Sequence, residues 1–197
     1  MTTTITRKPT ILTWQGVASP RLESVRLLVA DSRLKASGRI IAAASDDGPA
    51  FSASLEATTD QVGAFGRLLI RATTAEDECQ ISVTRTKDGL WLVDRGSGSE
   101  RGAFGGSMDV DVEGAVLFNC LAIRRLGLHK EAGSHELPVV HVSLPTLTVN
   151  LMQKTYTTVS IGDDMSVVNY KYGSIDVDLT VDSNGLVIDY PGFAQRV

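Results

Sequence analysis

Residues 174–190 read Ser-Ile-Asp-Val-Asp-Leu-Thr-Val-Asp-Ser-Asn-Gly-Leu-Val-Ile-Asp-Tyr, and this stretch decides the fold class. Its first half alternates between apolar and polar residues, and the apolar set is Ile175, Val177, Leu179 and Val181. Such alternation is typical of a strand with one buried face. A turn follows at residues 182–185, because Asn184 and Gly185 tolerate positive φ, and an apolar run then returns. The segment therefore predicts a β-hairpin.

The same pattern recurs along the chain. A second hairpin is predicted from Cys79 to Val93, with its turn at Lys87-Asp88-Gly89. Further strands are expected at Ile11 to Val17, Ser24 to Ala30, Gly38 to Ala44, Ala50 to Ala57, Arg67 to Thr73, Val139 to Leu144, Thr146 to Leu151, Thr155 to Ile161 and Val167 to Tyr172. At most one or two short helices are expected, and the best candidate is Phe118 to Leu126. The sequence predicts an all-β protein whose sheet closes around an apolar interior or packs on a second sheet.

Length and composition indicate one folded domain over residues 1–197. Hydrophobic residues make up 43% of the chain and charged residues 21%, far from the composition of disordered chains. The formal net charge is −4, and acidic and basic residues are interspersed. Because no basic stripe is available to neutralise a phosphate backbone, nucleic acid is not an expected partner.

The sequence contains no recognisable export signal or transmembrane segment. Met1 to Pro9 is rich in Thr, and no apolar run of signal-peptide length follows it. No stretch approaches the length of a bilayer-spanning helix. In such a chain Cys79 and Cys120 are expected to be reduced core residues, and the expected compartment is the cytoplasm. The oligomeric state is not predicted.

Several motifs for cofactors or catalysis do not fit. Gly96 to Gly106 is glycine-rich and is expected to be a mobile loop, but it lacks the Lys-Ser/Thr ending of a phosphate-binding loop. His129, His135 and His141 lie six residues apart, which matches no zinc pattern. No nucleophile motif stands between a strand and a helix. We therefore expect no cofactor and no metal.

Asp109 and Asp111 lie two residues apart on a predicted strand, so both carboxylates point to one face and Val110 and Val112 to the other. Paired carboxylates can act as acid and base or bind a metal. They are also what a solvated strand face looks like, and that simpler interpretation is favoured here.

Arg124 and Arg125 are adjacent cations at the end of an apolar stretch, where a short helical turn is expected to project them together. Guanidinium groups in such a setting need partners, and their planar fork suits carboxylates, phosphates or sugar hydroxyls. An internal salt bridge to Asp109 or Asp111 is slightly favoured over direct ligand contact. Both interpretations place these residues close together.

A set of short segments carries a resemblance to a known family. They are Asp88 to Trp91, Met108 to Val112, Asn119 with Ile123 to Leu126, Pro145 to Val149, Gln153 to Tyr156, and 182–193 with Arg196. In this order they resemble the bacterial and archaeal putative glycolipid-binding family, best from Asp88 onward. The chain departs from the family pattern at Val116 to Ala122, which lacks the two prolines that family members carry before the arginines.

The resemblance implies a long antiparallel sheet curled into an incomplete barrel, similar to periplasmic lipoprotein carrier proteins. Such a half-open barrel would offer a concave apolar face to acyl chains, and curved sheets of this size can enclose a ligand cavity. The leading hypothesis is non-catalytic binding of a glycolipid or another amphiphile.

The hypothesis assigns residues to the two parts of such a ligand. Asp109, Asp111, Asn119, Arg124 and Arg125 would lie near the head group, and Trp14, Trp91, Tyr156 and Tyr190 are candidate lining residues. Trp91 and Tyr190 are more simply interpreted as core. Two alternatives stay open. One is an enzyme that acts on a lipid-like or small hydrophobic substrate, with Asp109 or Asp111 as general base and Arg124 as anion stabiliser. The other is a structural or protein-interaction domain filled by its own side chains.

Overall fold

The computed structural model describes residues 8–30, 33–46 and 48–197, and all its named strands belong to one sheet. The strands are β1 (Thr10–Gly16), β2 (Arg21–Ala30), β3 (Arg33–Ala42), β4 (Phe51–Thr59), β5 (Phe65–Thr73), β6 (Glu78–Arg85), β7 (Trp91–Asp94), β8 (Ser99–Gly102), β9 (Asp109–Val112), β10 (Ser134–Val142), β11 (Val149–Ser160), β12 (Met165–Tyr172), β13 (Ile175–Asp182), β14 (Val187–Tyr190) and β15 (Ala194–Arg196). A short 3₁₀ turn, η1 (Phe104–Gly106), and one α-helix, α1 (Val116–Leu126), complete the described elements. The expected class, a single curled sheet with at most two short helices, is confirmed.

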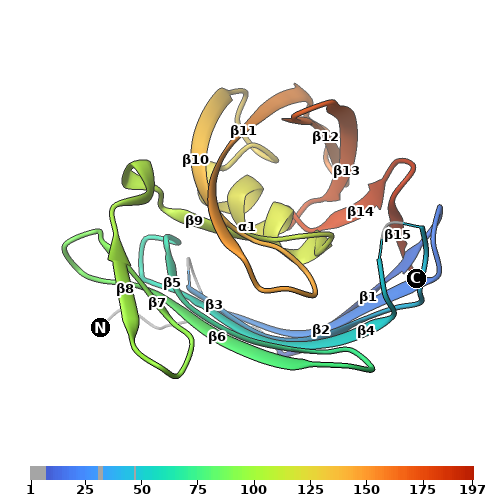
Figure 1. The fold of residues 1–197 in the computed structure, drawn as a ribbon. Helices are drawn as coiled ribbons and strands as arrows, with labels where there is room; N and C mark the ends of the chain where they lie inside the picture. Colours follow the sequence, from blue (N-terminus) through green and yellow to red (C-terminus); the bar gives the residue numbers. More distant parts are fainter. Residues whose placement is uncertain (1–7, 31–32, 47) are drawn as a thin grey trace.

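The sheet consists of two antiparallel meanders joined side by side. Its strand order is β8-β7-β6-β5-β4-β3-β2-β1-β15-β14-β13-β12-β11-β10-β9. The chain thus builds outward from β1 to one edge, crosses to the far edge, and returns to pair β15 with β1. In Figure 1 the first meander forms the lower layer, and β10–β13 arch above it with α1 between them. The sheet is curled but not closed into a barrel.

The segment that leads from β8 to the far edge of the sheet contains β9 and α1, and it places the helix inside the curled sheet. β9 runs parallel to β10, and α1 lies between them in sequence, so β9, α1 and β10 form a β-α-β unit within an otherwise antiparallel sheet. The chain just before β9 contacts the first meander, where the Phe65 amide of β5 donates a hydrogen bond of 2.9 Å to the Met108 carbonyl. The Trp91 indole donates to the neighbouring Ser107 carbonyl at 3.1 Å. These contacts protect the β9 edge of the sheet.

One continuous hydrophobic core fills the space between the two layers, and it includes α1. Eight consecutive α1 residues, Val116 to Ile123, are buried. Trp14 of β1 is 1% exposed, and its indole donates to the Val187 carbonyl of β14 at 2.9 Å, which ties the first meander to the second. The concave side of the sheet therefore holds a helix as well as side chains.

Three expectations about local structure are wrong. Residues 96–106 are not simply a loop, because Ser99–Gly102 pairs with β7 as an edge strand and a 3₁₀ turn follows. Residues 149–160 form one long strand rather than two, since the polar pair Gln153-Lys154 that interrupts the apolar pattern lies inside it. Cys79 is exposed on β6, whereas Cys120 is a buried, free thiol as expected.

The expectation that Met1 to Pro9 is not a signal peptide concerns mainly residues 1–7, which lie outside the described residues. Over the described part of the chain, no helix combines the length and apolar character needed to cross a membrane.

Candidate functional site

The concave face of the second meander carries ionisable and aromatic side chains in place of a purely apolar lining. Its members come from four adjacent strands and are Asp111, His141, Lys154, Tyr156, Tyr170 and Tyr172. Register accounts for their meeting, because Asp111 pairs with His141 across β9 and β10, and Tyr156 pairs with Tyr170 across β11 and β12. Paired residues project to the same side of a sheet. We call this set the concave network.

Asp111 is the centre of the concave network. Its Oδ2 atom lies 2.9 Å from His141 Nδ1 and 2.7 Å from Lys154 Nζ. Burial raises the pKa of Asp111, but Lys154 and His141 outweigh that effect, so the pKa lies below its ordinary value. The carboxylate is therefore held in its ionised form between the Lys154 ammonium group and the His141 imidazole.

Lys154 is an unusual residue for a protein interior, because its side chain is 3% exposed. Besides the contact with Asp111, its Nζ lies 5.2 Å from the ring centroid of Tyr170 and 5.3 Å from that of Tyr172. A cation over the face of an aromatic ring is attracted by the ring quadrupole. The carboxylate and the two rings together offset the cost of burying the ammonium group.

Asp109, the other carboxylate of β9, binds Arg125 from the end of α1 in a two-pronged arrangement. Arg125 Nε lies 2.9 Å from Oδ1, and Nη2 lies 2.5 Å from Oδ2. The predicted internal salt bridge is thus confirmed for this pair. The solvated-face interpretation is wrong, because Asp109 and Asp111 are each 6% exposed. The strand is buried along its whole length, so both carboxylates need internal partners.

Arg124 does not join Arg125, contrary to expectation. Consecutive residues of a helix point about 100° apart, and the Arg124 guanidinium turns to the Asn184 carbonyl in the β13–β14 turn. There it helps line a small pocket of about 90 Å³ together with Lys8, Thr10, Leu27, Val29, Asn184 and Leu186. The two arginines therefore serve different parts of the molecule.

Asn119 links the helix to the concave network. Its Oδ1 atom accepts a hydrogen bond of 2.8 Å from the Tyr156 hydroxyl, which is buried. A chain of rings continues from Tyr156 to Tyr170 at 5.2 Å and from Tyr170 to Tyr190 at 6.0 Å. Of the predicted lining residues, Tyr156 and Tyr190 therefore lie in this region. Both are buried members of the hydrophobic core, as the simpler interpretation of Tyr190 expects.

The two tryptophans lie in the core. Trp14 is 1% exposed and Trp91 is fully buried, stacked on Phe65 with 6.3 Å between ring centroids. Both indole N–H groups donate hydrogen bonds to backbone carbonyls. The interpretation of Trp91 as a core residue is thus supported, and Trp14 is also a core residue rather than a lining one.

Glu23, on β2, fixes the start of α1. Its two carboxyl oxygens accept the Val116 and Leu117 amides at 2.6 and 3.1 Å, while Ala115 at the N-cap offers no side-chain cap. Helix N-termini leave such amides unsatisfied and attract negative charge. Burial raises the pKa of Glu23 to about 7, although these two hydrogen bonds oppose the shift.

Comparison with known proteins agrees with this architecture. A model of the family described as putative glycolipid-binding matches residues 11–196. The chain belongs to this family. The sequence resemblance stated above is thereby confirmed over almost the whole chain, including the part before Asp88. A search of curated proteins finds no match.

A solved structure shows the same fold. The chain is similar to a DUF1089 family protein from Pseudomonas aeruginosa, known from a crystal structure, with a TM-score of 0.72 and 24% identity. The similarity covers 93% of this chain and 95% of that one. At this level of identity the likeness establishes the fold alone.

In this member of the glycolipid-binding family, the sequence motifs single out Asp111 and Tyr156 of the concave network as candidate site residues. They do not single out its other four members, which are His141, Lys154, Tyr170 and Tyr172. A signal was present for Lys154, which occupies the same alternating set as Met152 and Tyr156 and so points to the buried face. A charged residue in an inward-facing set predicts an internal partner, and here the partner is Asp111.

The arrangement suits polar recognition better than acid–base catalysis. Asp109 is ion-paired, and the pKa of Asp111 is lowered, which makes it a weak base at neutral pH. Arg124, the predicted anion stabiliser, lies in a different region from both. Among the described residues, no group of three or more His, Cys, Asp or Glu side chains is placed to hold a metal.

Proposed function

We propose that this chain binds a glycolipid or a similar amphiphile, with its polar head group against the concave network and its apolar part along neighbouring aliphatic side chains. The single observation that carries the proposal is the buried Asp111–Lys154 pair with His141. Buried ion pairs seldom stabilise a fold more than apolar residues of the same size would. Their presence in the curl of the sheet therefore favours a purpose in recognition.

The chemistry of the concave network supports a head group rich in hydroxyls. Carboxylates accept hydrogen bonds from sugar hydroxyls, and Lys and His side chains donate them. Tyr172, a partly exposed member of the network, adds an aromatic ring with a polar tip, which suits the apolar face of a sugar ring. The family description, which names glycolipids, points the same way.

The exposure of the side chains suggests a direction of approach. The exposed fraction rises from 3% at Lys154 to 12% at Arg125, so a head group would enter from the Arg125 side. Leu126 and Leu137 are partly buried hydrophobic residues next to that region. Leu137 shares a strand face with Val139, the register partner of Asp109. An acyl chain lying over these residues would continue the contact.

The experiment is titration with an environment-sensitive fluorescent fatty acid, followed by displacement with glycolipids. The test variant combines Asp111→Asn with Lys154→Met, which removes both charges and leaves no unpaired ion. The matched control combines Asp88→Asn with Arg101→Met, which removes an exposed pair 2.9 Å apart on the first meander. We expect at least a tenfold loss of affinity in the test variant and less than twofold in the control. Equal affinities in a folded test variant would refute the proposed site.

A further inference from the structure

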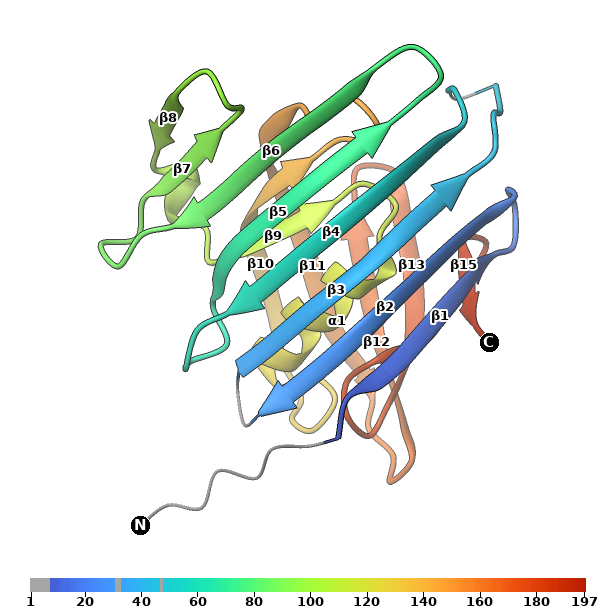
Figure 2. The same ribbon diagram turned by 90° about the horizontal axis from the view of Figure 1, so that it is seen from below.

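The outer face of the first meander is a broad, open surface. In β2–β6 one set of alternating residues packs into the core and the other points away from it. Figure 2 looks directly onto this outward side, and no other described element crosses it. The face is therefore available to a partner.

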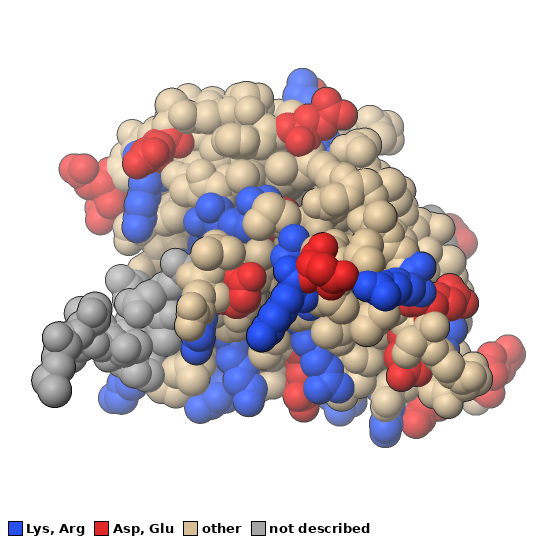
Figure 3. All heavy atoms as spheres, turned by 90° about the vertical axis from the view of Figure 1, so that its left-hand side faces the viewer, with Lys and Arg blue, Asp and Glu red and all other residues tan. Residues whose placement is uncertain are grey.

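Charge distinguishes this outer face from the molecule as a whole. Six exposed basic side chains project from it, on three strands: Arg26, Arg33, Lys35, Arg39, Arg67 and Arg71. Two exposed acidic residues, Glu56 and Glu78, share the outward-facing set of β2–β6. The whole chain has a net charge of −4, so the excess of positive charge is local. In Figure 3 several Lys and Arg side chains project along the lower edge, where this face lies, with acidic groups between some of them.

Register aligns the basic residues in rows across the strands. Arg39 and Arg71 flank Ser54, because Arg39 pairs with Ser54 and Ser54 with Arg71. Lys35 and Arg67 flank Thr58 in the same way. Small hydroxyl side chains thus separate the cations and leave their heads accessible. An array of cations with hydroxyl groups between them complements a surface of closely spaced phosphates.

An aliphatic margin borders the basic rows. Leu22 and Ile41 are direct cross-strand partners and are 40% and 50% exposed, and Ile11, opposite Arg26, is 69% exposed. Exposed aliphatic side chains next to basic ones are characteristic of surfaces that settle at a membrane interface. A soluble polyanion would use the cations but gain little from this margin.

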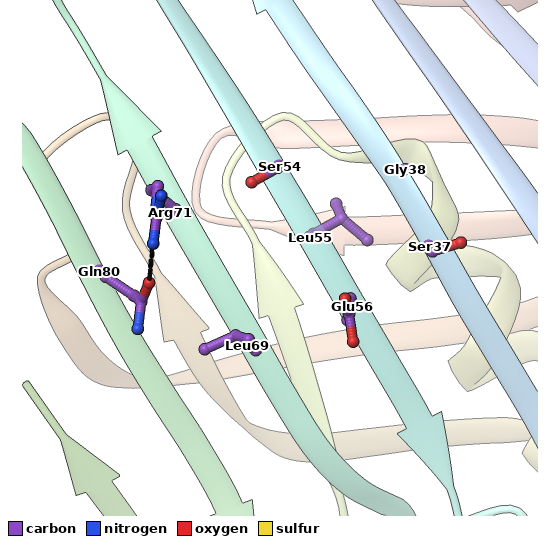
Figure 4. A pocket seen from close by; sticks show the side chains of 8 residues that line it. All are labelled: Ser37, Gly38, Ser54, Leu55, Glu56, Leu69, Arg71 and Gln80. Carbon is purple, nitrogen blue, oxygen red and sulfur yellow. Dashed lines mark hydrogen bonds between the residues drawn. The ribbon is translucent and has the colours of Figure 1, made fainter.

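A shallow groove lies within the basic rows, with a volume of about 280 Å³. It is lined by Ser37, Gly38, Ser54, Leu55, Glu56, Leu69, Arg71 and Gln80. Figure 4 shows Arg71 and Gln80 side by side on neighbouring strands, and the Gln80 side-chain oxygen accepts bonds of 2.8 and 3.1 Å from the guanidinium. Arg71 also lies 3.6 Å from the exposed Glu78 carboxylate, so Gln80 and Glu78 together hold it beside the groove, where a protruding phosphate could reach it.

We propose that this outer face docks on the surface of an anionic phospholipid bilayer, with the basic rows against phosphates and Leu22 and Ile41 at the acyl boundary. Anionic bilayers attract basic groups within about a Debye length of the surface. The inference goes beyond ligand binding in the curl of the sheet and does not depend on it. A protein that bound no glycolipid would still dock.

The test is sedimentation of the full chain with vesicles of phosphatidylcholine alone or with 30% phosphatidylglycerol. The variant combines Lys35→Glu with Arg39→Glu, and the control combines Lys130→Glu with Lys171→Glu, which makes the same change in net charge at other exposed positions. We expect binding to the anionic vesicles alone, at least a tenfold loss in the variant, less than twofold loss in the control, and reversal by 0.5 M salt. A second variant, Leu22→Thr with Ile41→Thr, should weaken binding without removing it.

Three results would overturn the proposal: no binding to anionic vesicles, equal binding to neutral ones, or equal losses in the variant and its control. Binding to heparin with none to vesicles would instead identify a soluble polyanion as the partner. Circular dichroism of each variant establishes that it is folded.

Discussion

At the scale of single residues, the interior of this protein depends on a few charged groups whose partners come from distant parts of the chain. Glu23 and the α1 amides that it caps are 93 and 94 residues apart in sequence, and Asp111 reaches His141 and Lys154 on the next two strands. Each such group is costly without its partner. The effect of a substitution at one of these positions should therefore depend strongly on whether it leaves a buried charged group without its partner.

Glu23 should make stability depend on pH. Its pKa is about 7 in the folded protein and 4.5 in the unfolded chain, so between these values the folded state binds more protons. Stability should therefore fall as the pH rises from 4.5 to 7 and show no further Glu23 contribution above that. The contribution is on the order of 3 kcal/mol. Urea unfolding at pH 5 and 7.5 should show this fall in the parent protein relative to Glu23→Gln. Parallel stability curves for the two would show that Glu23 titrates normally.

Lys154→Met should destabilise the protein by about 3 kcal/mol, because it leaves the Asp111 carboxylate buried with His141 as its remaining partner. Adding Asp111→Asn should recover most of that loss, since the unpaired charge is then gone. A double-mutant cycle by urea unfolding measures the coupling. Additive losses would mean that the two side chains do not depend on each other.

At the scale of elements, α1 is held at both ends by features that a local pattern describes only in part. Gly127 caps its C-terminus. This residue has a φ of 71°, and its amide donates a hydrogen bond of 3.2 Å to the Arg124 carbonyl. Leu128 adds a bond of 3.1 Å to the Ile123 carbonyl, completing a Schellman-type cap. The cap also fixes the last turn, from which Arg125 reaches Asp109.

Gly127→Ala should cost about 1 kcal/mol, because an L-residue is strained at this positive φ. No atom lies within 4 Å of the position of the added Cβ, so the cost comes from the backbone alone. Gly48→Ala is the control, since it also meets open space but has no φ in the strained range. Thermal unfolding of both should lower the Tm of the first substitution and leave the second nearly unchanged. Equal effects would contradict the assignment of the cap.

The elements also show what the sequence could and could not predict. Strands such as β13 and β12 were predictable because one face is buried and the other is solvated, which imposes a period of two. β9 was harder, since both of its faces are buried and its carboxylates look like a solvated face in the sequence. The Asp109–Arg125 pair was predictable, because the sequence indicates either an internal salt bridge from the two arginines to Asp109 or Asp111 or direct contact with a ligand. The Asp111–Lys154 contact depends on the register of three strands, which the local sequence does not specify.

At the scale of the whole molecule, the two meanders share one sheet and one core, and the curl is maintained by contacts between them. β1 pairs with β15, and β5 meets the chain just before β9. We therefore propose that residues 1–197 fold as one domain. Differential scanning calorimetry should give a single transition with equal calorimetric and van't Hoff enthalpies. Two separate transitions would indicate that the meanders fold independently.

The same architecture gives the molecule two distinct faces. The curl of the second meander encloses helix α1 and the concave network, while the outer face of the first meander is open and basic. We thus propose ligand binding inside the curl of the second meander and bilayer docking on the outer face of the first, and the variants described above test the two separately.

The most direct test of the central claim, that the chain binds an amphiphile, is organic extraction of the purified protein followed by lipid mass spectrometry. The account predicts a glycolipid or related amphiphile in near-stoichiometric amount, which is reduced in the Asp111→Asn, Lys154→Met variant and retained in the Asp88→Asn, Arg101→Met control. A folded protein that yields no lipid, and that also fails to bind a fluorescent fatty acid, would contradict it.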